Sequence, residues 1–356
     1  MTQDTKDSKY CDLLGFLNLQ GMPPIADSSI STYVKLIHVT SAPPFRKDKL
    51  GHELPLTTDF VLDSHYSFRE TVESQSFLKS IFTTQDLDDL GDYQTGVVYG
   101  IQHAPEDAHL VNLHKLYSAG IRVVTPCYQG INKYGGGFLH PDSRLSSLGA
   151  ELIHCLCEVG FIIDVAHCGH RTALDILDIL QLLSYKKIIA SHTGLYEIYE
   201  NPRNINSQIA KKIANLGGLI GVYGLTFGLS DSQGEYSYAI DDIAVMMSHL
   251  AAISIELGDD NTGIENLDNV CFGTDGIYKH LDFNEWQSNV LRMISLIDPD
   301  KKLGARFPDL PFALNSISKL QIIADKLSSS ITFPEEWNAK NRIMRENIWS
   351  FFKSAL

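Results

Sequence analysis

The sequence predicts a (β/α)8 barrel, a TIM-like fold of the α/β class. Short β-rich runs alternate with longer stretches of helical periodicity, and at least six such units follow one another along the chain. No glycine-rich dinucleotide fingerprint follows the first strand of the series. A barrel is therefore favoured over a doubly wound sheet, and residues 1–356 are expected to form a single domain.

The elements follow in order. Residues 97–102 form an apolar run typical of a buried strand, and 107–119 carry leucines at helical spacing. Leucines also mark one face of a helix over 148–159, which Gly160 ends before the strand FIIDVAH at 161–167. The same patterns predict further strands at 121–128, 187–192, 218–225 and 269–275, and helices at 173–183, 207–216, 240–256, 311–326 and 335–352.

The N-terminal part is less regular. Residues 1–55 are predicted to form an irregular extension packed outside the barrel, because 22–45 are rich in Pro, Ser and Thr. The run FVLDSH at 60–65 is expected to be the strand that opens the barrel.

The acidic composition limits the classes of partner. The chain has 43 Asp+Glu against 29 Lys+Arg, a formal net charge of −14, which disfavours binding to nucleic acid. Hydrophobic residues make up 44% of it, but no run of 18 apolar residues is present that could cross a membrane. Residues 1–16 lack the apolar stretch of a signal peptide, and six cysteines in so long a chain do not form a disulfide framework. We expect a cytoplasmic protein that binds neither nucleic acid nor membranes.

Chemically useful side chains gather at the predicted strand ends, where a barrel carries its active site. Histidine and carboxylate together match the ligands that zinc and similar divalent metals prefer. A single buried histidine is usually a structural group, but several at successive strand ends favour one shared metal site. The candidates are Asp63, His65, Gln102, His103, Tyr128, Asp164, His167, His192 and Asp275.

These segments resemble the membrane (renal) dipeptidase family, which comprises zinc dipeptidases of the amidohydrolase-type barrel. The resemblance runs from about Asp63 to the C-terminus, in the same order and with similar spacing. It implies a metal-dependent hydrolase fold, activity on dipeptides and a homodimer. The segments that carry it are DSHYS (63–67), GIQHA (100–104), LYSAGIRVVTPCY (116–128), LGAELIHCLCEVGFIIDVAH (148–167), IIASHTGLYEIYENPRN (188–204), VCFGTDG (270–276) and RIMRENIWSFF (342–352).

Part of the family's metal site is not matched. In the family an H-x-D pair and a bridging Glu hold the first metal. His65 matches that histidine, but Ser67 stands in place of the aspartate. Gln102 stands in place of the bridging glutamate, and Tyr128 replaces a histidine that contacts the substrate.

The other family positions are retained. His167 and His192 match the histidines of the second metal, and Asp275 matches the aspartate that acts as acid and base. Arg203 matches the residue expected to hold a substrate carboxylate. Burying uncompensated positive charge is unfavourable, so the loss of carboxylates predicts one zinc ion rather than two. That ion would be held by His167 and His192, with help from His65, Asp275 or water. Gln102 is the fourth candidate metal residue, after His65, His167 and His192, and His103 could substitute as a ligand.

The sequence therefore favours a metal-dependent hydrolase that cleaves dipeptides or a related small carboxylated amide through a metal-activated water. Asp275 would move the proton, while Arg203 and Tyr128 would bind the substrate. Two alternatives stand beside this hypothesis. One is a catalytically silent relative that binds a small molecule or serves in assembly, and the other is a pocket repurposed for different chemistry on a modified peptide.

Overall fold

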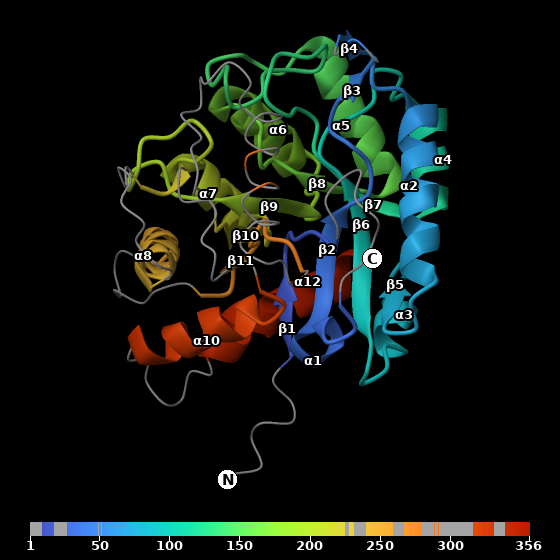
Figure 1. The fold of residues 1–356 in the computed structure, drawn as a ribbon. Helices are drawn as coiled ribbons and strands as arrows, with labels where there is room; N and C mark the ends of the chain where they lie inside the picture. Colours follow the sequence, from blue (N-terminus) through green and yellow to red (C-terminus); the bar gives the residue numbers. More distant parts are fainter. Residues whose placement is uncertain are drawn as a thin grey trace.

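The computed structural model describes residues 9–17, 27–48, 50, 52–224, 228–230, 240–258, 267–278, 288, 291, 316–330 and 339–356. It confirms the predicted barrel: parallel strands with helices around them (Figure 1). The strands are β1 (Tyr10–Asp12), β2 (Val34–Thr40), β3 (Arg46–Lys47), β4 (Glu53–Leu54), β5 (Leu78–Ser80), β6 (Thr95–Ile101), β7 (Ile121–Val124), β8 (Ile162–Asp164), β9 (Ile188–Thr193), β10 (Leu219–Val222) and β11 (Val270–Phe272).

The strand order explains how the sheet curls into a barrel. Within the described residues the order is β1-β2-β6-β7-β8-β9-β10-β11, with β5 added beside β6, and every neighbouring pair is parallel. The two ends of this path meet, because the backbone N–H of Leu13 donates to the carbonyl of Phe272 at 2.9 Å. Just beyond, the N–H of Asp275 donates to the carbonyl of Leu14 at 2.9 Å. Loop hydrogen bonds thus close the barrel between β1 and β11, while β3 and β4 form a separate antiparallel hairpin.

The helices lie outside the strands, and Figure 1 shows α2, α4, α5, α6, α7 and α8 arranged around them. Residues 311–315 and 335–338 of the predicted terminal helices, and residue 225 of the predicted strand 218–225, lie outside the described residues. The helices are α1 (Ile30–Tyr33), α2 (Thr58–Glu73), α3 (Thr84–Asp88), α4 (Leu110–Ala119), α5 (Ser147–Val159), α6 (His170–Leu182), α7 (Ser207–Asn215), α8 (Ile240–Glu256), α10 (Lys319–Ser330), α11 (Ala339–Asn341), the π-helix η4 (Arg342–Glu346) and α12 (Asn347–Ala355).

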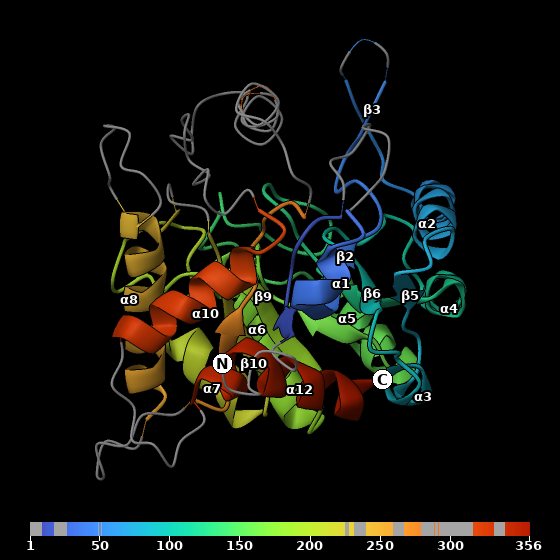
Figure 2. The ribbon, with the colours of Figure 1, turned by 60° about the horizontal axis from the view of Figure 1, so that its bottom comes forward.

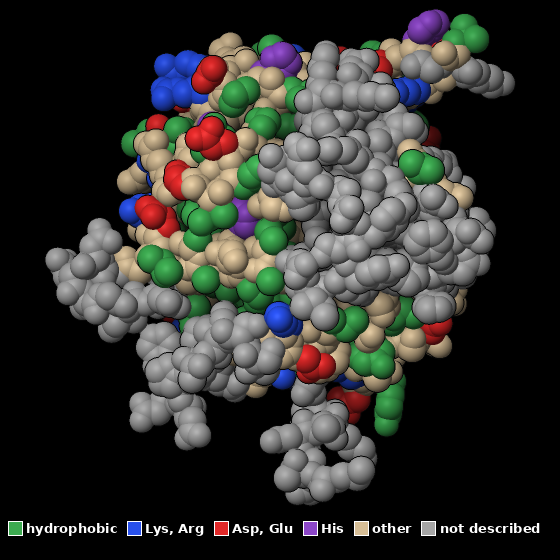
Figure 3. Space-filling model, turned by 60° about the vertical axis from the view of Figure 1, so that its left-hand side comes forward, with side chains coloured by type: hydrophobic (Ala, Val, Ile, Leu, Met, Phe, Trp, Pro, Cys, Tyr) green, Lys and Arg blue, Asp and Glu red, His purple; other side chains and the backbone are tan. Residues whose placement is uncertain are grey.

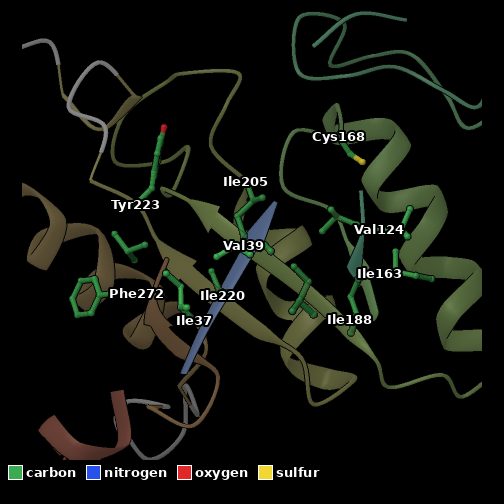
Figure 4. Close-up of a cluster of buried hydrophobic side chains, with 14 of the residues drawn as sticks. Ile37, Val39, Val124, Ile163, Cys168, Ile188, Ile205, Ile220, Tyr223 and Phe272 are labelled. Atoms are coloured by element: carbon green, nitrogen blue, oxygen red, sulfur yellow. The ribbon is translucent and has the colours of Figure 1, made fainter. Parts of the chain in front are cut away.

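One hydrophobic layer lies between the strands and the helices. Side chains alternate along each strand, so Val124, Ile163 and Ile188 leave their strands on the outer face and pack against leucines and isoleucines of the helices (Figure 4). Each such side chain contributes roughly 1.5–3 kcal/mol when fully buried. Because these strands are apolar on both faces, their sequences read as continuous apolar runs.

A second layer fills the barrel at the end where the strands begin. Nearly every strand contributes one buried side chain to it, among them Leu36, Val98 and Ile189. Ile348 and Phe352 of α12 pack against this layer, and Figure 2 shows α10 and α12 at that end of the molecule. Since α12 covers this end, the opposite end, where the strands finish, is the place for a site.

Two expectations about the N-terminal half are wrong. Residues 60–65 are not a strand but part of α2, which begins where the Thr57 hydroxyl accepts the N–H of Phe60 and buries Val61, His65 and Val72 along one face. Residues 1–55 are not merely an outer extension, because β1 and β2 belong to the barrel. Short apolar runs do not distinguish a strand from a turn of helix, so tertiary pairing decided both cases.

The described surface carries both kinds of charge. On the described part of the face shown in Figure 3, acidic and basic side chains lie interspersed among hydrophobic and other polar groups. Among the helices that the structure describes, none has the length and apolar character needed to cross a bilayer. All six cysteines are free thiols.

Candidate active site

Two histidines meet at the ends of neighbouring strands. His167 follows β8 and His192 lies in β9, and their Nε2 atoms are 2.9 Å apart. Both rings are buried, with 7% and 0% of their surface exposed. Burial, reinforced by the charge of Arg203, holds the pKa of each imidazole well below its ordinary value. Both are therefore neutral at pH 7, which is the form that binds metals.

Polar neighbours surround His192. Its Nδ1 lies 2.7 Å from the hydroxyl oxygen of Ser191, and that hydroxyl donates to the Asp164 carboxylate at 2.5 Å. On the other side of the ring, Nε2 of the Gln102 amide lies 3.4 Å from Nε2 of His192. The structure thus brings together Gln102, His167 and His192, three of the four residues predicted to hold a metal.

Aromatic rings flank this histidine pair. Tyr128 stacks on His167 with ring centroids 4.1 Å apart and planes inclined by 30°, and Phe138 approaches the same imidazole at 5.8 Å. Phe45, from the segment after β2, lies 6.4 Å from the Tyr128 ring. Burial raises the pKa of Tyr128, and the carboxylate of Asp275 raises it further. The phenol therefore stays protonated at neutral pH.

Arg203 lies beside these aromatic rings. Its guanidinium lies 5.5 Å from the ring centroid of Phe138 and 5.6 Å from that of Tyr223, and Nη2 donates to the carbonyl of His192 at 3.3 Å. Nη1 is buried and has no hydrogen-bond partner among the residues that the structure describes. A buried guanidinium with an unused donor is suited to an anionic group, above all a carboxylate.

Asp275 follows β11 in an unusual backbone conformation. Its φ is +55°, and that of His167 is +70°, both in the left-handed region that side chains rarely adopt. Such conformations are disfavoured by about 1–3 kcal/mol and concentrate at functional sites. Burial raises the pKa of Asp275 to about 7; the charge of Arg203 opposes this rise and that of Asp12 adds to it.

Two buried charged residues that the sequence patterns did not reveal, Asp12 and Lys319, lie near the seam between β1 and β11. Asp12 accepts hydrogen bonds from the hydroxyls of Thr274 and Tyr278, each at 2.6 Å. Lys319 at the start of α10 is fully buried; its ammonium donates to the carbonyl of Ile277 and lies 3.4 Å from the Tyr278 ring centroid. Burial lowers the pKa of Lys319 to about 7, against the opposing charge of Asp12. The pair lies on either side of the loop that carries Asp275.

Other histidine predictions need correction. His65 lies on α2, where Nε2 is 3.0 Å from the carbonyl of Ala119 and Nδ1 is 2.9 Å from the hydroxyl of Ser41. Its ring meets Tyr99 edge-on at 5.0 Å, in the layer between α2 and β6, outside the barrel. His65 therefore lies apart from the His167–His192 pair. The cause is the helix at 58–73, which also places Ser67 on the exposed surface.

His103 does not substitute as a ligand either. Its Nδ1 lies 2.7 Å from the carbonyl of Pro44, and its Nε2 accepts from the amide of Asn132 at 2.9 Å. Both ring nitrogens are thus used within the protein.

The donors present fit one metal ion better than two. The Nε2 atoms of His167 and His192 lie side by side, as those of two imidazole ligands of one ion do. Nδ1 of His167 is buried and has no hydrogen-bond partner within the described part of the chain. Among the described residues, no group of three His, Cys, Asp or Glu side chains is arranged to hold a metal. Two ions would share two imidazoles and a neutral amide, too little negative charge for a buried pair of dications.

Part of the chain matches a known protein family. Residues 58–269 match the family described as membrane dipeptidase, peptidase family M19. An uncharacterized dipeptidase of Schizosaccharomyces pombe is 28% identical over 169 residues, 44% of this chain and 39% of that protein. An uncharacterized Klebsiella pneumoniae protein from the pqqA 5' region is 26% identical over 165 residues, 43% of this chain and 59% of its own length. The matched segment therefore spans less than two thirds of these curated relatives.

Solved structures share the fold over the whole chain. An amidohydrolase from Pseudomonas aeruginosa superposes with a TM-score of 0.74 at 20% identity, covering 99% of this chain and 97% of that one. A metallopeptidase from Rhodobacter sphaeroides, bound to a phosphinate mimic of the dipeptide L-Ala-D-Ala, gives 0.69 at 14% identity, covering 98% and 99%. The family match covers more than half of the sequence, so the chain belongs to the membrane dipeptidase family, a family of metal-dependent hydrolases.

Proposed function

We propose that the protein is a metal-dependent hydrolase that cleaves dipeptides or a related small carboxylated amide, with one zinc ion. The observation that carries the proposal is a juxtaposition of the His167–His192 pair with Arg203. The Nη2 of Arg203 donates to the backbone carbonyl of His192, and its buried Nη1 has no hydrogen-bond partner among the described residues. A metal-ligand pair next to a carboxylate receptor is the arrangement that a peptidase of short peptides needs.

His167 and His192 would hold the ion through Nε2. The Gln102 amide lies beside them and presents its oxygen to the same point after a half-turn of its terminal bond. A bound divalent cation would supply a Lewis acid and would lower the pKa of water toward about 7. Because Asp275 has a pKa near 7, its carboxyl can both accept and release a proton at neutral pH.

The remaining residues bind and orient the substrate. Arg203 would hold the carboxylate with the donor that the protein leaves unused. Tyr128 and Phe138 flank His167 and would exclude water from the reacting amide. The Tyr128 hydroxyl stays protonated and can donate a hydrogen bond to the substrate.

A second candidate is a catalytically silent or repurposed relative that binds a small molecule or a modified peptide. It is favoured by the neutral amide of Gln102 and by the contact of the two imidazoles, which bond to each other without an ion. Arg203 would hold a carboxylate in that case too.

Metal content and hydrolysis distinguish the candidates. Protein loaded with zinc and then dialysed would be analysed for metal, and a panel of dipeptides that includes L-Ala-D-Ala would be tested for cleavage. About one equivalent, with hydrolysis lost in His192→Ala and kept in His114→Ala, supports the proposal; His114 is an exposed histidine of α4. Two equivalents would contradict the single ion. No metal and no hydrolysis, with retained binding of dipeptides, would favour the silent relative.

Location and assembly are further parts of the proposal. The six free thiols support a cytoplasmic protein, and the net charge of −14 supports small-molecule partners rather than nucleic acid or an anionic membrane surface. A homodimer is implied by the family resemblance, and sedimentation equilibrium would test it.

A further inference from the structure

A chain of hydrogen bonds leads from the barrel interior to the histidine pair. It begins at Asp164, the last residue of β8, and passes through Ser191 and His192 of β9 to His167. Asp164 and Ser191 have 1% and 0% of their surface exposed, so water does not compete for these bonds. Every link is 2.5–2.9 Å long.

The direction of each bond follows from the first link. Oδ1 of Asp164 accepts the backbone N–H groups of Ser191 and Ala166, both at 3.0 Å. Oδ2 accepts the hydroxyl of Ser191 at 2.5 Å and that of Thr125 at 3.4 Å. With four donors around it, the carboxylate acts only as an acceptor.

The tautomer of His192 follows in turn. The single hydroxyl proton of Ser191 points to Asp164, so the oxygen offers a lone pair to Nδ1 of His192, and Nδ1 must carry the hydrogen. Nε2 of the neutral ring is then unprotonated and turns its lone pair toward Nε2 of His167. That lone pair is what a metal ligand needs.

We propose that Asp164 and Ser191 are positioning residues that hold His192 in the Nδ1–H tautomer, with the Nε2 lone pair aimed at the metal point. This inference rests on the proposed function for its purpose, but the tautomer itself is a property of the metal-free protein. Neither residue would touch metal or substrate.

An isosteric substitution of Asp164 should reverse the direction of the hydrogen bonds between residue 164 and His192. In Asp164→Asn the amide oxygen still accepts the two backbone N–H groups, but its NH₂ must donate to Ser191. The Ser191 hydroxyl then donates to Nδ1 of His192, and the hydrogen moves to Nε2, where it blocks the metal point. Ser191→Ala removes the link without reversing it, whereas Ser191→Thr keeps a hydroxyl. Ser254→Ala is the matched control, because that buried serine bonds only to the carbonyl of Leu250 within α8.

The first test is long-range ¹H–¹⁵N NMR of metal-free protein labelled at histidine, with the His192 signal assigned by its loss in His192→Gln. We expect an unprotonated Nε2 in the wild type, Ser191→Thr and Ser254→Ala, a protonated Nε2 in Asp164→Asn, and mixed tautomers in Ser191→Ala. A protonated Nε2 in the wild type, or no change in both Asp164→Asn and Ser191→Ala, would overturn the inference. If Asp164→Asn does not fold, Ser191→Ala decides.

The second test is zinc affinity, measured by competition with a chromophoric chelator. Loss of a partner behind a metal-binding histidine weakens metal binding by about 10- to 100-fold, and we expect this for Asp164→Asn and Ser191→Ala but not for Ser191→Thr or Ser254→Ala. Equal affinity in all variants would overturn the positioning role. If the wild type binds no zinc while the tautomers shift as stated, the proposed metal function fails and the control of the tautomer stands.

Discussion

Tyr128 stacks on His167 with ring centroids 4.1 Å apart, and this contact joins the segment that follows β7 to the segment that follows β8. His167 has a φ of +70°, so its backbone is in a conformation that the local sequence does not favour. Packing must hold the ring in place, and the tyrosine ring is its closest aromatic neighbour. Tyr128 therefore supports the ring of His167.

Removal of the Tyr128 ring should therefore weaken the site and the fold together. We expect Tyr128→Ala to lower the free energy of unfolding by about 2–3 kcal/mol, measured by urea denaturation, because an aromatic contact and its buried area are lost. Tyr128→Phe keeps the stack and should stay within about 0.5 kcal/mol of the wild type. Equal stability of the alanine and phenylalanine variants would contradict a supporting role.

Acid should destabilise the protein through its buried histidines. Burial lowers the pKa of His65 and of His38 to about 4 in the folded protein. The unfolded chain takes up these protons below about pH 6.5 and the folded protein only below about 4, so stability is lost as the pH falls through this window. A difference of about 2.5 units corresponds to about 3 kcal/mol for each histidine.

A variant of His65 tests this account. His65→Asn should flatten the dependence of unfolding free energy on pH between 6.5 and 4, measured by urea titrations at several pH values. His114→Asn, at an exposed position of α4, is the matched control and should leave the slope unchanged. An unaltered slope in His65→Asn would show that this imidazole does not titrate as stated.

The raised pKa of Asp275 should lower the stability of the protein at neutral pH. Its pKa is about 7 in the folded protein, whereas the unfolded carboxyl ionises near 4, so stability is lost as the pH rises from about 4 to 7. Asp275→Asn removes that loss and keeps a residue type that accepts the left-handed backbone. We expect equal stability near pH 4 and a gain of up to about 4 kcal/mol at pH 8, with any hydrolysis reduced by about 100-fold or more. A gain in stability over the wild type that is no larger at pH 8 than at pH 4 would refute the raised pKa.

The unpaired donor of Arg203 predicts a carboxylate-dependent binding loss. In isothermal titration with a phosphinate dipeptide mimic, Arg203→Lys should bind about tenfold more weakly, since lysine keeps the charge but loses the planar fork. Arg203→Met should bind about 100-fold more weakly. The same mimic with its carboxylate converted to an amide is the control, and wild type and variants should bind it alike. An equal loss for both ligands would show that Arg203 acts on the fold instead.

The buried pair at the β1–β11 seam predicts strong coupling. Lys319→Met removes a buried cation whose charge favours the ionised carboxyl of Asp12, and we expect a loss of roughly 3–5 kcal/mol in unfolding free energy. Asp12→Asn combined with Lys319→Met should lose less than the sum of the single variants, by about 0.5–3 kcal/mol in a double-mutant cycle. Additive losses would mean that the two groups do not sense each other.

The barrel and three of its site residues were predictable because they depend on local patterns. A run such as FIIDVAH ends a buried strand wherever it occurs, and parallel strands of a barrel end on one side. His167, His192 and Gln102 are therefore brought together, and Tyr128 beside them, by the order of strands alone. Asp275 was predicted in the same way, from the end of its strand, and the family resemblance added Arg203 through its motif.

The positions of other residues could not be predicted, also for a physical reason. His65 ends a short apolar run that could form either a strand or a helix. Only the strand pairing shows that β1 and β2 come first in the barrel: β1 pairs with β2, and β2 pairs with β6. Lys319 is far from Asp12 in the sequence, so no spacing pattern joins them.

By itself the sequence determined the alternation of strands and helices, the acidic surface and the histidines at strand ends, because each depends on residues close together in the chain. Tertiary structure decided which strand closes the barrel, which nitrogen of His192 faces its partner and why Arg203 keeps an unused donor. Those features depend on contacts between segments that are distant in sequence, and in a buried site such contacts set burial, charge and hydrogen-bond direction.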